Sequence, residues 1–138
     1  MSSEEQADAY LEEAKLTLAS AQAIFQTAEK SGDELWAQVV KNGYDAIEQA
    51  VSAGIAAEDE AIPRNHPGKI NTFIELYAPR KEIEEILLHW LQRRSSSQYV
   101  DIRGDRLNIP HEQFTREDAS QILDDVEIVL RYVEDQLN

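Results

Sequence analysis

A basic cluster stands out in the segment LLHWLQRRSSSQYVDIRGDR, which spans residues 87–106. This stretch holds more arginine than any other part of the chain, which as a whole carries 27 Asp and Glu against 13 Lys and Arg. Arginine and hydroxyl side chains are donors suited to an anionic group. Arg93, Arg94 and Tyr99 therefore form a candidate anion site. The alternative is that both arginines only complement the negative end of a helix dipole, and that the serines after them unwind the helix.

Histidine is the side chain best suited to proton transfer near neutral pH. His66, His89 and His111 lie in three different segments, and none has a partner at a convincing metal-ligand spacing. Glu85 comes nearest, four residues before His89, whereas di-iron bundles use Glu-x-x-His. We therefore predict no metal site and no cofactor. Cysteine nucleophiles and glycine-rich phosphate loops are also absent from the sequence, so any chemistry must come from Arg, His, Tyr, Ser and carboxylate groups.

Two further positions are candidates for the same site. His66 lies in a connection that contains two prolines, from which it could reach a groove beside Arg94 or, with Asn65, cap the following helix. Tyr44 and Glu48 are one helical turn apart, and both would face that groove if this side of the helix is interior. The alternative for Tyr44 is a place in the hydrophobic core.

Apolar residues recur at steps of three and four in five segments, which is the pattern of amphipathic helices. The segments 58–68 and 98–115 contain proline and glycine and are predicted to be connections, the second of them a loop. No segment alternates convincingly with period two, so no sheet is predicted. The sequence thus predicts an all-α fold, a single domain over residues 1–138, built as an antiparallel up-and-down bundle of four to five helices. The five apolar stripes are Tyr10, Ala14, Leu18, Ala21, Phe25 and Ala28; Trp36, Val40, Tyr44, Ile47, Val51 and Ile55; Ile70, Phe73, Ile74 and Tyr77; Ile83, Ile86, Leu87, Trp90 and Leu91; and Ile122, Val126, Val129, Val133 and Leu137.

Capping signals predict where these helices begin and end. Gly32 predicts the end of the first helix. Two glycines lie inside the second helix, where glycine lowers helix propensity, so each is expected to mark a close contact between helices. The predicted N-terminal caps are Ser2 or Ser3, ahead of Glu5 and Gln6, then Asp33 and Thr115, and the two interior glycines are Gly43 and Gly54.

The composition limits the environment and the partners. The chain has no cysteine and no window of about 20 apolar residues, which indicates a soluble cytoplasmic protein in a reducing compartment and no membrane span. A net charge of −14 repels nucleic acid and anionic membranes, so any contact with phosphate must come from a local patch. The dense carboxylate surface indicates either adaptation to high salt or an ordinary acidic protein.

Three segments together resemble the HEPN family. Residues 42–57, NGYDAIEQAVSAGIAA, resemble the second helix of that family, in which an aromatic residue and an acid lie in an alanine-rich helix. A connection that carries a histidine follows, here residues 62–66. The helix that ends in RSSSQY, residues 94–99, is similar to the family's R-x-x-x-[D]-Y ending, with Gln98 where Asp is common, and a last helix completes the domain.

This resemblance implies a helical bundle that usually dimerises. Many members are paired with a minimal nucleotidyltransferase as toxin and antitoxin, active members are metal-independent ribonucleases with an R-x(4–6)-H motif, and others bind nucleotides or act as scaffolds. The present sequence departs from the ribonuclease motif, because the fifth position after Arg94 is Tyr99 instead of histidine, and tyrosine with a pKa near 10 is a poor base. Arg106 and His111 do satisfy R-x(4)-H, but in the predicted loop and next to Pro110.

Three hypotheses follow from these residues. In the first, a homodimer binds a nucleotide or RNA phosphate and works with a nucleotidyltransferase partner in a toxin–antitoxin or defence pair. Arg94 then contacts the phosphate, Arg93 supports it, and Tyr99 stacks or donates a hydrogen bond. In the second, the protein is a ribonuclease that uses Arg106 and His111, or Arg94 with a histidine from elsewhere. In the third, it is a non-catalytic dimer that binds other proteins.

Overall fold

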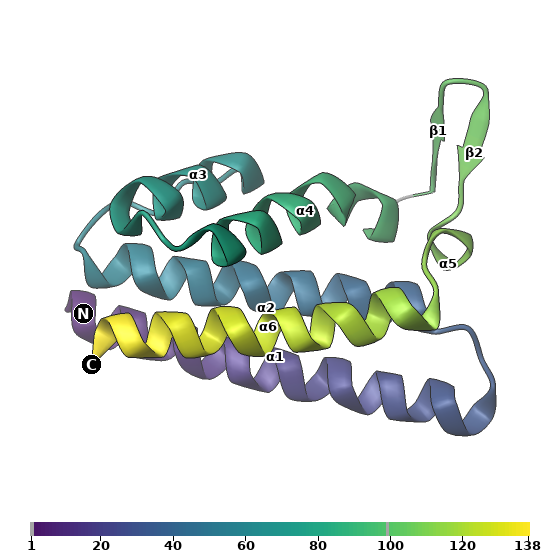
Figure 1. Cartoon of the computed structure of the whole chain (residues 1–138), viewed down its shortest axis with the longest axis horizontal. Helices are drawn as coiled ribbons and strands as arrows, with labels where there is room; N and C mark the ends of the chain where they lie inside the picture. The colour runs from purple at the N-terminus through teal and green to yellow at the C-terminus, as the bar shows by residue number, and fades with distance from the viewer. Residues whose placement is uncertain (1, 99) are drawn as a thin grey trace.

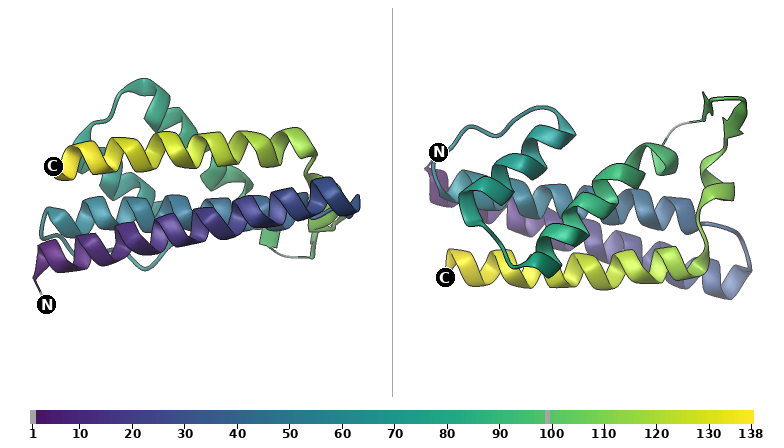
Figure 2. Two further views of the ribbon diagram at one scale, coloured as in Figure 1. Left: turned by 90° about the horizontal axis from the view of Figure 1, so that it is seen from below. Right: turned by 45° about the horizontal axis from the view of Figure 1, so that its top comes forward.

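Three long helices form the body of the molecule and lie side by side in both Figure 1 and Figure 2. The computed structural model describes residues 2–98 and 100–138. α1 and α2 run in opposite directions, α6 runs in the direction of α2, and the N- and C-terminal ends of the chain lie at the same end of the bundle. The bounds of the long helices are Ser3–Ser31 for α1, Trp36–Ala57 for α2 and Arg116–Leu137 for α6.

Two shorter helices pack against this body. α3 (His66–Tyr77) and α4 (Lys81–Gln98) contact each other and α2, and α4 also contacts α6. The predicted all-α helical bundle is confirmed. No helix in the described part of the chain is long and apolar enough to cross a membrane.

The segment after α4 differs from the predicted loop. It forms a hairpin of β1 (Asp101–Arg103) and β2 (Arg106–Asn108), followed by the one-turn helix α5 (Pro110–Gln113). The strands pair antiparallel with Ile102 opposite Leu107, and Gly104 at φ 66° supplies the left-handed residue that a tight turn needs. Strands of three residues are too short to show a period of two, which is why the prediction of a loop without strands was wrong here.

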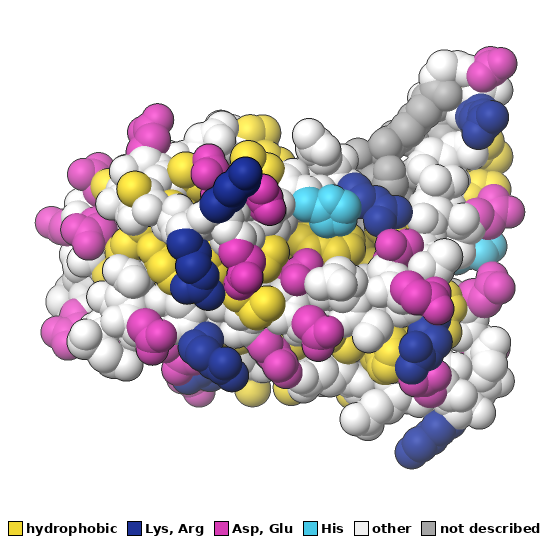
Figure 3. Space-filling model, viewed as in Figure 1, with side chains coloured by type: hydrophobic (Ala, Val, Ile, Leu, Met, Phe, Trp, Pro, Cys, Tyr) yellow, Lys and Arg dark blue, Asp and Glu magenta, His cyan; other side chains and the backbone are white. Residues whose placement is uncertain are grey.

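Acidic side chains cover much of the surface. Asp and Glu are spread over the whole face seen in Figure 3, while Lys and Arg are fewer and scattered among them. The hairpin instead carries exposed apolar side chains at Val100, Ile102 and Leu107. It projects from the bundle beside the C-terminal end of α4 (Figure 1).

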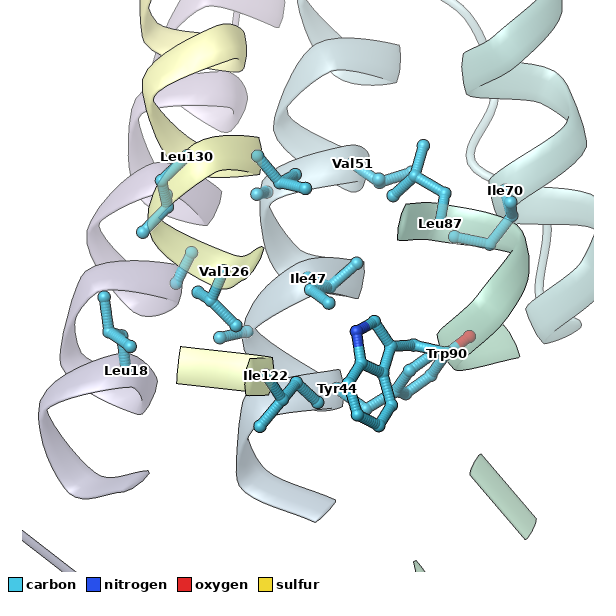
Figure 4. Packing of buried hydrophobic residues seen from close by; sticks show 14 of the residues in the cluster. Leu18, Tyr44, Ile47, Val51, Ile70, Leu87, Trp90, Ile122, Val126 and Leu130 are labelled. Carbon is cyan, nitrogen blue, oxygen red and sulfur yellow. The ribbon is translucent and has the colours of Figure 1, made fainter. Parts of the chain in front are cut away.

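The hydrophobic core is centred on α2, which contacts every other helix. Figure 4 shows side chains of α1, α4 and α6 converging on Ile47 and its neighbours on α2. A Cβ atom on Gly43 would lie 3.0 Å from the Ile122 side chain, and one on Gly54 would lie 2.6 Å from Phe73. Both glycines therefore mark close contacts between helices, as predicted.

The helix caps agree with the sequence at most positions. Ser2 accepts a hydrogen bond from the Glu5 N–H, α1 ends at Gly32 in the left-handed conformation, and Thr115 forms a reciprocal capping box with Asp118. The prediction for Asp33 was wrong, because α2 begins after Leu35, which makes no side-chain cap.

Candidate functional site

A buried carboxylate lies at the centre of the candidate site. Glu48 of α2 is only 7% exposed, which is unusual for an acid and requires hydrogen-bonding partners. Two residues from the first turn of α3 supply them. His66 directs Nδ1 to Glu48 Oε2, and Lys69 donates from Nζ to Glu48 Oε1 at 3.3 Å.

The first turn of α3 is fixed by its own cap. The Asn65 side chain accepts a hydrogen bond of 2.6 Å from the Gly68 N–H and so starts the helix at His66. His66 and Lys69 are three residues apart and consequently share one face of α3. Asn65 therefore forms the cap that one alternative predicted, while His66 contacts Glu48.

Tyr44 lies one turn before Glu48 on α2, between His66 and Arg94. The His66 ring packs edge-on with its centroid 6.2 Å from that of Tyr44, and the Arg94 guanidinium carbon lies 6.0 Å from the Tyr44 ring centroid. Arg94 is partly buried and donates a hydrogen bond of 3.4 Å to Gln98. We call the five residues Tyr44, Glu48, His66, Lys69 and Arg94 the Tyr44 cluster.

The Tyr44 hydroxyl is a buried donor within this cluster. The residue is 1% exposed, and its hydroxyl lies beside the Glu48 carboxylate. Figure 4 shows the ring beside Trp90, with the hydroxyl directed toward α4. Burial and the nearby Glu48 charge raise the pKa of Tyr44 well above its ordinary value, against the opposing effect of Arg94. The hydroxyl therefore stays protonated and can donate.

Asp45 adds a second carboxylate at the edge of the cluster. Burial and the negative charge of Glu48 raise its pKa, while Lys41, Arg94 and His66 act in the opposite direction. The arrangement is therefore a mixed-charge site, with Arg94 and Lys69 near the carboxylates of Glu48 and Asp45.

Arg93 makes a different set of contacts from Arg94. It forms an ion pair of 3.0 Å with Asp118, donates to the Gln113 carbonyl at 3.2 Å, and stacks 4.5 Å from the Phe114 ring centroid. Burial acts to raise the pKa of Asp118, but hydrogen bonds from Thr115 and Arg93 leave it below its ordinary value. Arg93 thus connects α4 to the start of α6. The sequence had instead suggested that Arg93 supports Arg94 at the anion site.

The remaining candidates lie near or on the hairpin. Tyr99 falls outside the described residues. Arg106 on β2 and His111 on α5 are both exposed to solvent, and none of the hydrogen bonds, ion pairs or ring contacts among the described residues joins them. The pair stays a prediction. In the described ranges, no group of three or more His, Asp and Glu side chains comes together as a ligand set for a metal ion.

Sequence reasoning missed two residues of this region, Lys69 and Asp45. Lys69 could have been found from its spacing of three residues to His66, since both must lie on the same face of one helical turn. Asp45 gave no such signal, because an acid next to a core residue is usually part of a solvated helix face.

A comparison with family models places this arrangement in a known context. The model of the HEPN domain matches residues 5–136. The chain belongs to the HEPN family. The resemblance predicted from its motifs is confirmed over nearly the whole domain, including α2, the connection with His66 and the end of α4. No curated protein matches this HEPN chain.

Proposed function

We propose that this HEPN protein binds a phosphate group of a nucleotide or of RNA at Arg94, within the Tyr44 cluster. One observation carries the proposal: the partly buried Arg94 guanidinium lies over the ring of Tyr44, whose buried hydroxyl stays protonated beside the Glu48 carboxylate. A phosphate oxygen at this position would accept from both side chains. Arginine and neutral hydroxyl donors are a common combination around phosphate.

The local charge supports this proposal in spite of the acidic surface. Lys69 pairs with the Glu48 carboxylate and offsets part of the repulsion that Glu48 would exert on an anion. The whole-chain charge of −14 disfavours long-range attraction of RNA, so this local site has to supply the affinity.

RNA cleavage is the second candidate function, and the position of His66 favours it. His66 and Arg94 both lie against the ring of Tyr44, which gives the histidine and arginine of a metal-independent ribonuclease from two separate elements. The Nδ1–Glu48 contact orients the imidazole, and Nε2 is then the atom able to move a proton at a ribose hydroxyl. The alternative pair, Arg106 and His111, would place the reaction at the hairpin instead.

We further propose that the protein acts as a cytoplasmic homodimer, paired with a nucleotidyltransferase in a toxin–antitoxin or defence system. The hairpin supports the dimer. Val100, Ile102 and Leu107 are 67%, 75% and 57% exposed, and an isolated two-stranded hairpin is only marginally stable in water. The hairpin also carries the exposed Arg106, which complements the acidic surface of a second copy. A non-catalytic scaffold would have the same dimer but no ligand.

Calorimetric titration with ATP and with a short RNA tests the phosphate site. We expect Arg94→Ala to weaken binding at least about tenfold, since a charge-assisted hydrogen bond contributes about 1.5–3 kcal/mol. Arg131→Ala, which removes an exposed arginine on α6, is the matched control and should bind like the wild type. Equal affinity of the Arg94→Ala and Arg131→Ala proteins would remove Arg94 from the site. Cleavage of RNA by wild type but not by His66→Asn, with His111→Ala active, would support the ribonuclease function at the cluster.

A further inference from the structure

A groove of about 370 Å³ lies between α4 and α6, two helices that contact each other (Figure 1). We call it the α4–α6 groove. Its volume is within the range of small-molecule sites, about 300–1,000 Å³. Its lining shares no residue with the Tyr44 cluster, so the two are separate candidate sites. The lining residues are Glu82, Glu85, Ile86 and His89 of α4 and Gln121, Asp125 and Ile128 of α6.

The α4–α6 groove contains a buried negative charge. Asp125 is 6% exposed, and its two carboxylate oxygens accept hydrogen bonds of 2.8 Å from Trp90 Nε1 and Gln121 Nε2. Both donors are neutral, and no Lys, Arg or His side chain among the described residues forms an ion pair with Asp125. Asp is seldom buried to this extent without a partner of opposite charge. A cation that enters the groove is therefore attracted by a charge that the chain itself leaves unbalanced.

The negative charges lie toward both ends of the groove. α4 and α6 run antiparallel here, since Trp90 donates to Asp125 whereas Arg80 lies over the ring of Tyr132. Trp90 thus marks the place of Asp125 along α4. Glu85 precedes Trp90 by five residues, which is about 7.5 Å along a helix that rises 1.5 Å per residue. One carboxylate consequently belongs to each end, separated by the length of a short aliphatic chain.

The middle of the groove is apolar. Ile86 follows Glu85 on α4, Ile128 lies one turn after Asp125 on α6, and both isoleucines are half-buried and line the groove. Apolar side chains favour methylene groups because their contact removes apolar surface from water. A ligand with charged ends and an aliphatic middle therefore matches this lining, in the way that lysine buries its stem and keeps its ammonium group among polar partners.

The polar groups at both ends are accessible to a ligand. Glu82 pairs with Arg80 at 3.5 Å and Glu85 pairs with Lys81 at 3.8 Å, and all four of these side chains are exposed. Exposed ion pairs contribute little, so a ligand cation replaces Arg80 or Lys81 at small cost. At the other end, the exposed Gln121 donates its amide N–H to the buried carboxylate, which leaves its amide oxygen to accept from a ligand.

We propose that the α4–α6 groove binds a small aliphatic diamine. One ammonium group pairs with Glu85, and the other donates to Gln121, where the charge of Asp125 stabilises it. Ile86 and Ile128 cover the methylene chain between the two ammonium groups. This site goes beyond the proposed phosphate site and does not depend on it.

NMR titrations with three ligands of similar chain length test the proposal. Putrescine carries an ammonium group at both ends of its chain, butylamine at one end, and butanol at neither. At constant ionic strength, we expect putrescine to bind at least about tenfold more tightly than butylamine, because it makes a second charge-assisted contact. The indole N–H signal of Trp90 should shift, since this group donates to Asp125, whereas Trp36, the other tryptophan of the chain, should keep its signal.

Variants assign the preference to the groove. Glu85→Gln should lower the affinity for putrescine about tenfold, to the level of butylamine. Glu13→Gln, at an exposed position on α1, controls for the general attraction of cations to an acidic surface and should bind putrescine like the wild type. Both positions are exposed, so circular dichroism is expected to show both variants folded. Asp125→Asn keeps an oxygen that accepts from Trp90 and should weaken the binding of both amines.

Three results would overturn the diamine site. Equal affinity of wild type for putrescine and butylamine would mean that the groove takes a single amine, such as that of a lysine side chain. Equal affinity of Glu85→Gln and Glu13→Gln for putrescine would mean that cations gather over the acidic surface without using this groove. A shift of the Trp36 signal with Trp90 unmoved would place the amine elsewhere on the protein. None of these results bears on Arg94, whose titration with ATP tests the phosphate site independently.

Discussion

His66, the first residue of α3, directs its Nδ1 to the buried carboxylate of Glu48 on α2. The two residues are 18 positions apart in the chain, and their contact joins the start of α3, after the connection of residues 58–65, to the centre of the bundle. A surface histidine and a surface acid would contribute little, but Glu48 is shielded from water and depends on its partners. This contact therefore serves both the stability of the fold and the orientation of a candidate catalytic side chain.

Glu48→Gln removes the charge while keeping the size of the side chain. We expect a loss of about 1–3 kcal/mol in the free energy of unfolding, because Lys69 and His66 lose a charged acceptor in a partly buried place. Urea denaturation measures it. Glu13→Gln, at an exposed position on α1, is the control and should change stability by less than about 0.5 kcal/mol. Equal stability of the two variants would show that the Glu48 contacts are not important for the fold.

Arg93 and Arg94 are expected to differ in what their removal changes. Arg93→Ala breaks the ion pair with Asp118 and the stacking on Phe114, so we expect it to lower stability by about 1 kcal/mol with little effect on nucleotide affinity. Arg94→Ala should weaken nucleotide binding more than it lowers stability. Thermal denaturation and calorimetry on both variants test this division, and a larger loss of affinity in Arg93→Ala would contradict it.

Asp45→Asn should stabilise the protein at neutral pH. The folded-state pKa of Asp45 is raised by burial and by Glu48, so the folded protein binds this proton more tightly than the unfolded chain does. The stability that this bound proton contributes is present at pH values below the pKa of Asp45 in the unfolded chain. It is lost as the pH rises through the pKa of Asp45 in the folded protein. The advantage of the Asn variant should therefore grow as pH rises from about 4, the ordinary value for Asp, toward 7. Unfolding in urea at several pH values measures it, with Asp8→Asn on the exposed face of α1 as the control. A variant less stable than wild type at pH 7 would contradict the expectation.

Salt should stabilise this protein. Its 27 acidic side chains repel one another, and the screening length falls from about 10 Å at 0.1 M salt to about 3 Å at 1 M. We expect the midpoint of thermal unfolding to rise with KCl. Loss of structure below molar KCl would indicate adaptation to high salt, and a chain fully folded in dilute buffer would indicate an ordinary acidic protein. A midpoint independent of KCl would contradict the role assigned to surface repulsion.

The helices could be predicted from the sequence because each carries a long apolar stripe and most have a recognisable cap. Gly43 and Gly54 were also informative, since glycine inside a helix is costly unless another helix needs the space. Two local features could not be predicted well. Asp33 has the chemistry of a cap but lies too far from the first turn of α2, and the hairpin strands are too short to show their period.

The site could be predicted only in part. Tyr44, His66 and Arg94 were chosen for their chemistry, and the fold brings these three together. Their relation to Glu48 and Lys69 depends on how α3 and α4 pack on α2, which no local pattern records. Arg93 and Arg94 show the same limit of sequence reasoning. The two side chains have the same chemistry, and they make different contacts only because they point in different directions around the helix.

An NMR titration of the aromatic and imidazole signals with ATP tests the central claim most directly. If phosphate binds within the Tyr44 cluster, the ring signals of Tyr44 and His66 should shift in wild type and remain unchanged in Arg94→Ala, while the His111 signals stay in place in both proteins. Shifts of His111 with Tyr44 and His66 unmoved would place the ligand at the hairpin and contradict the account.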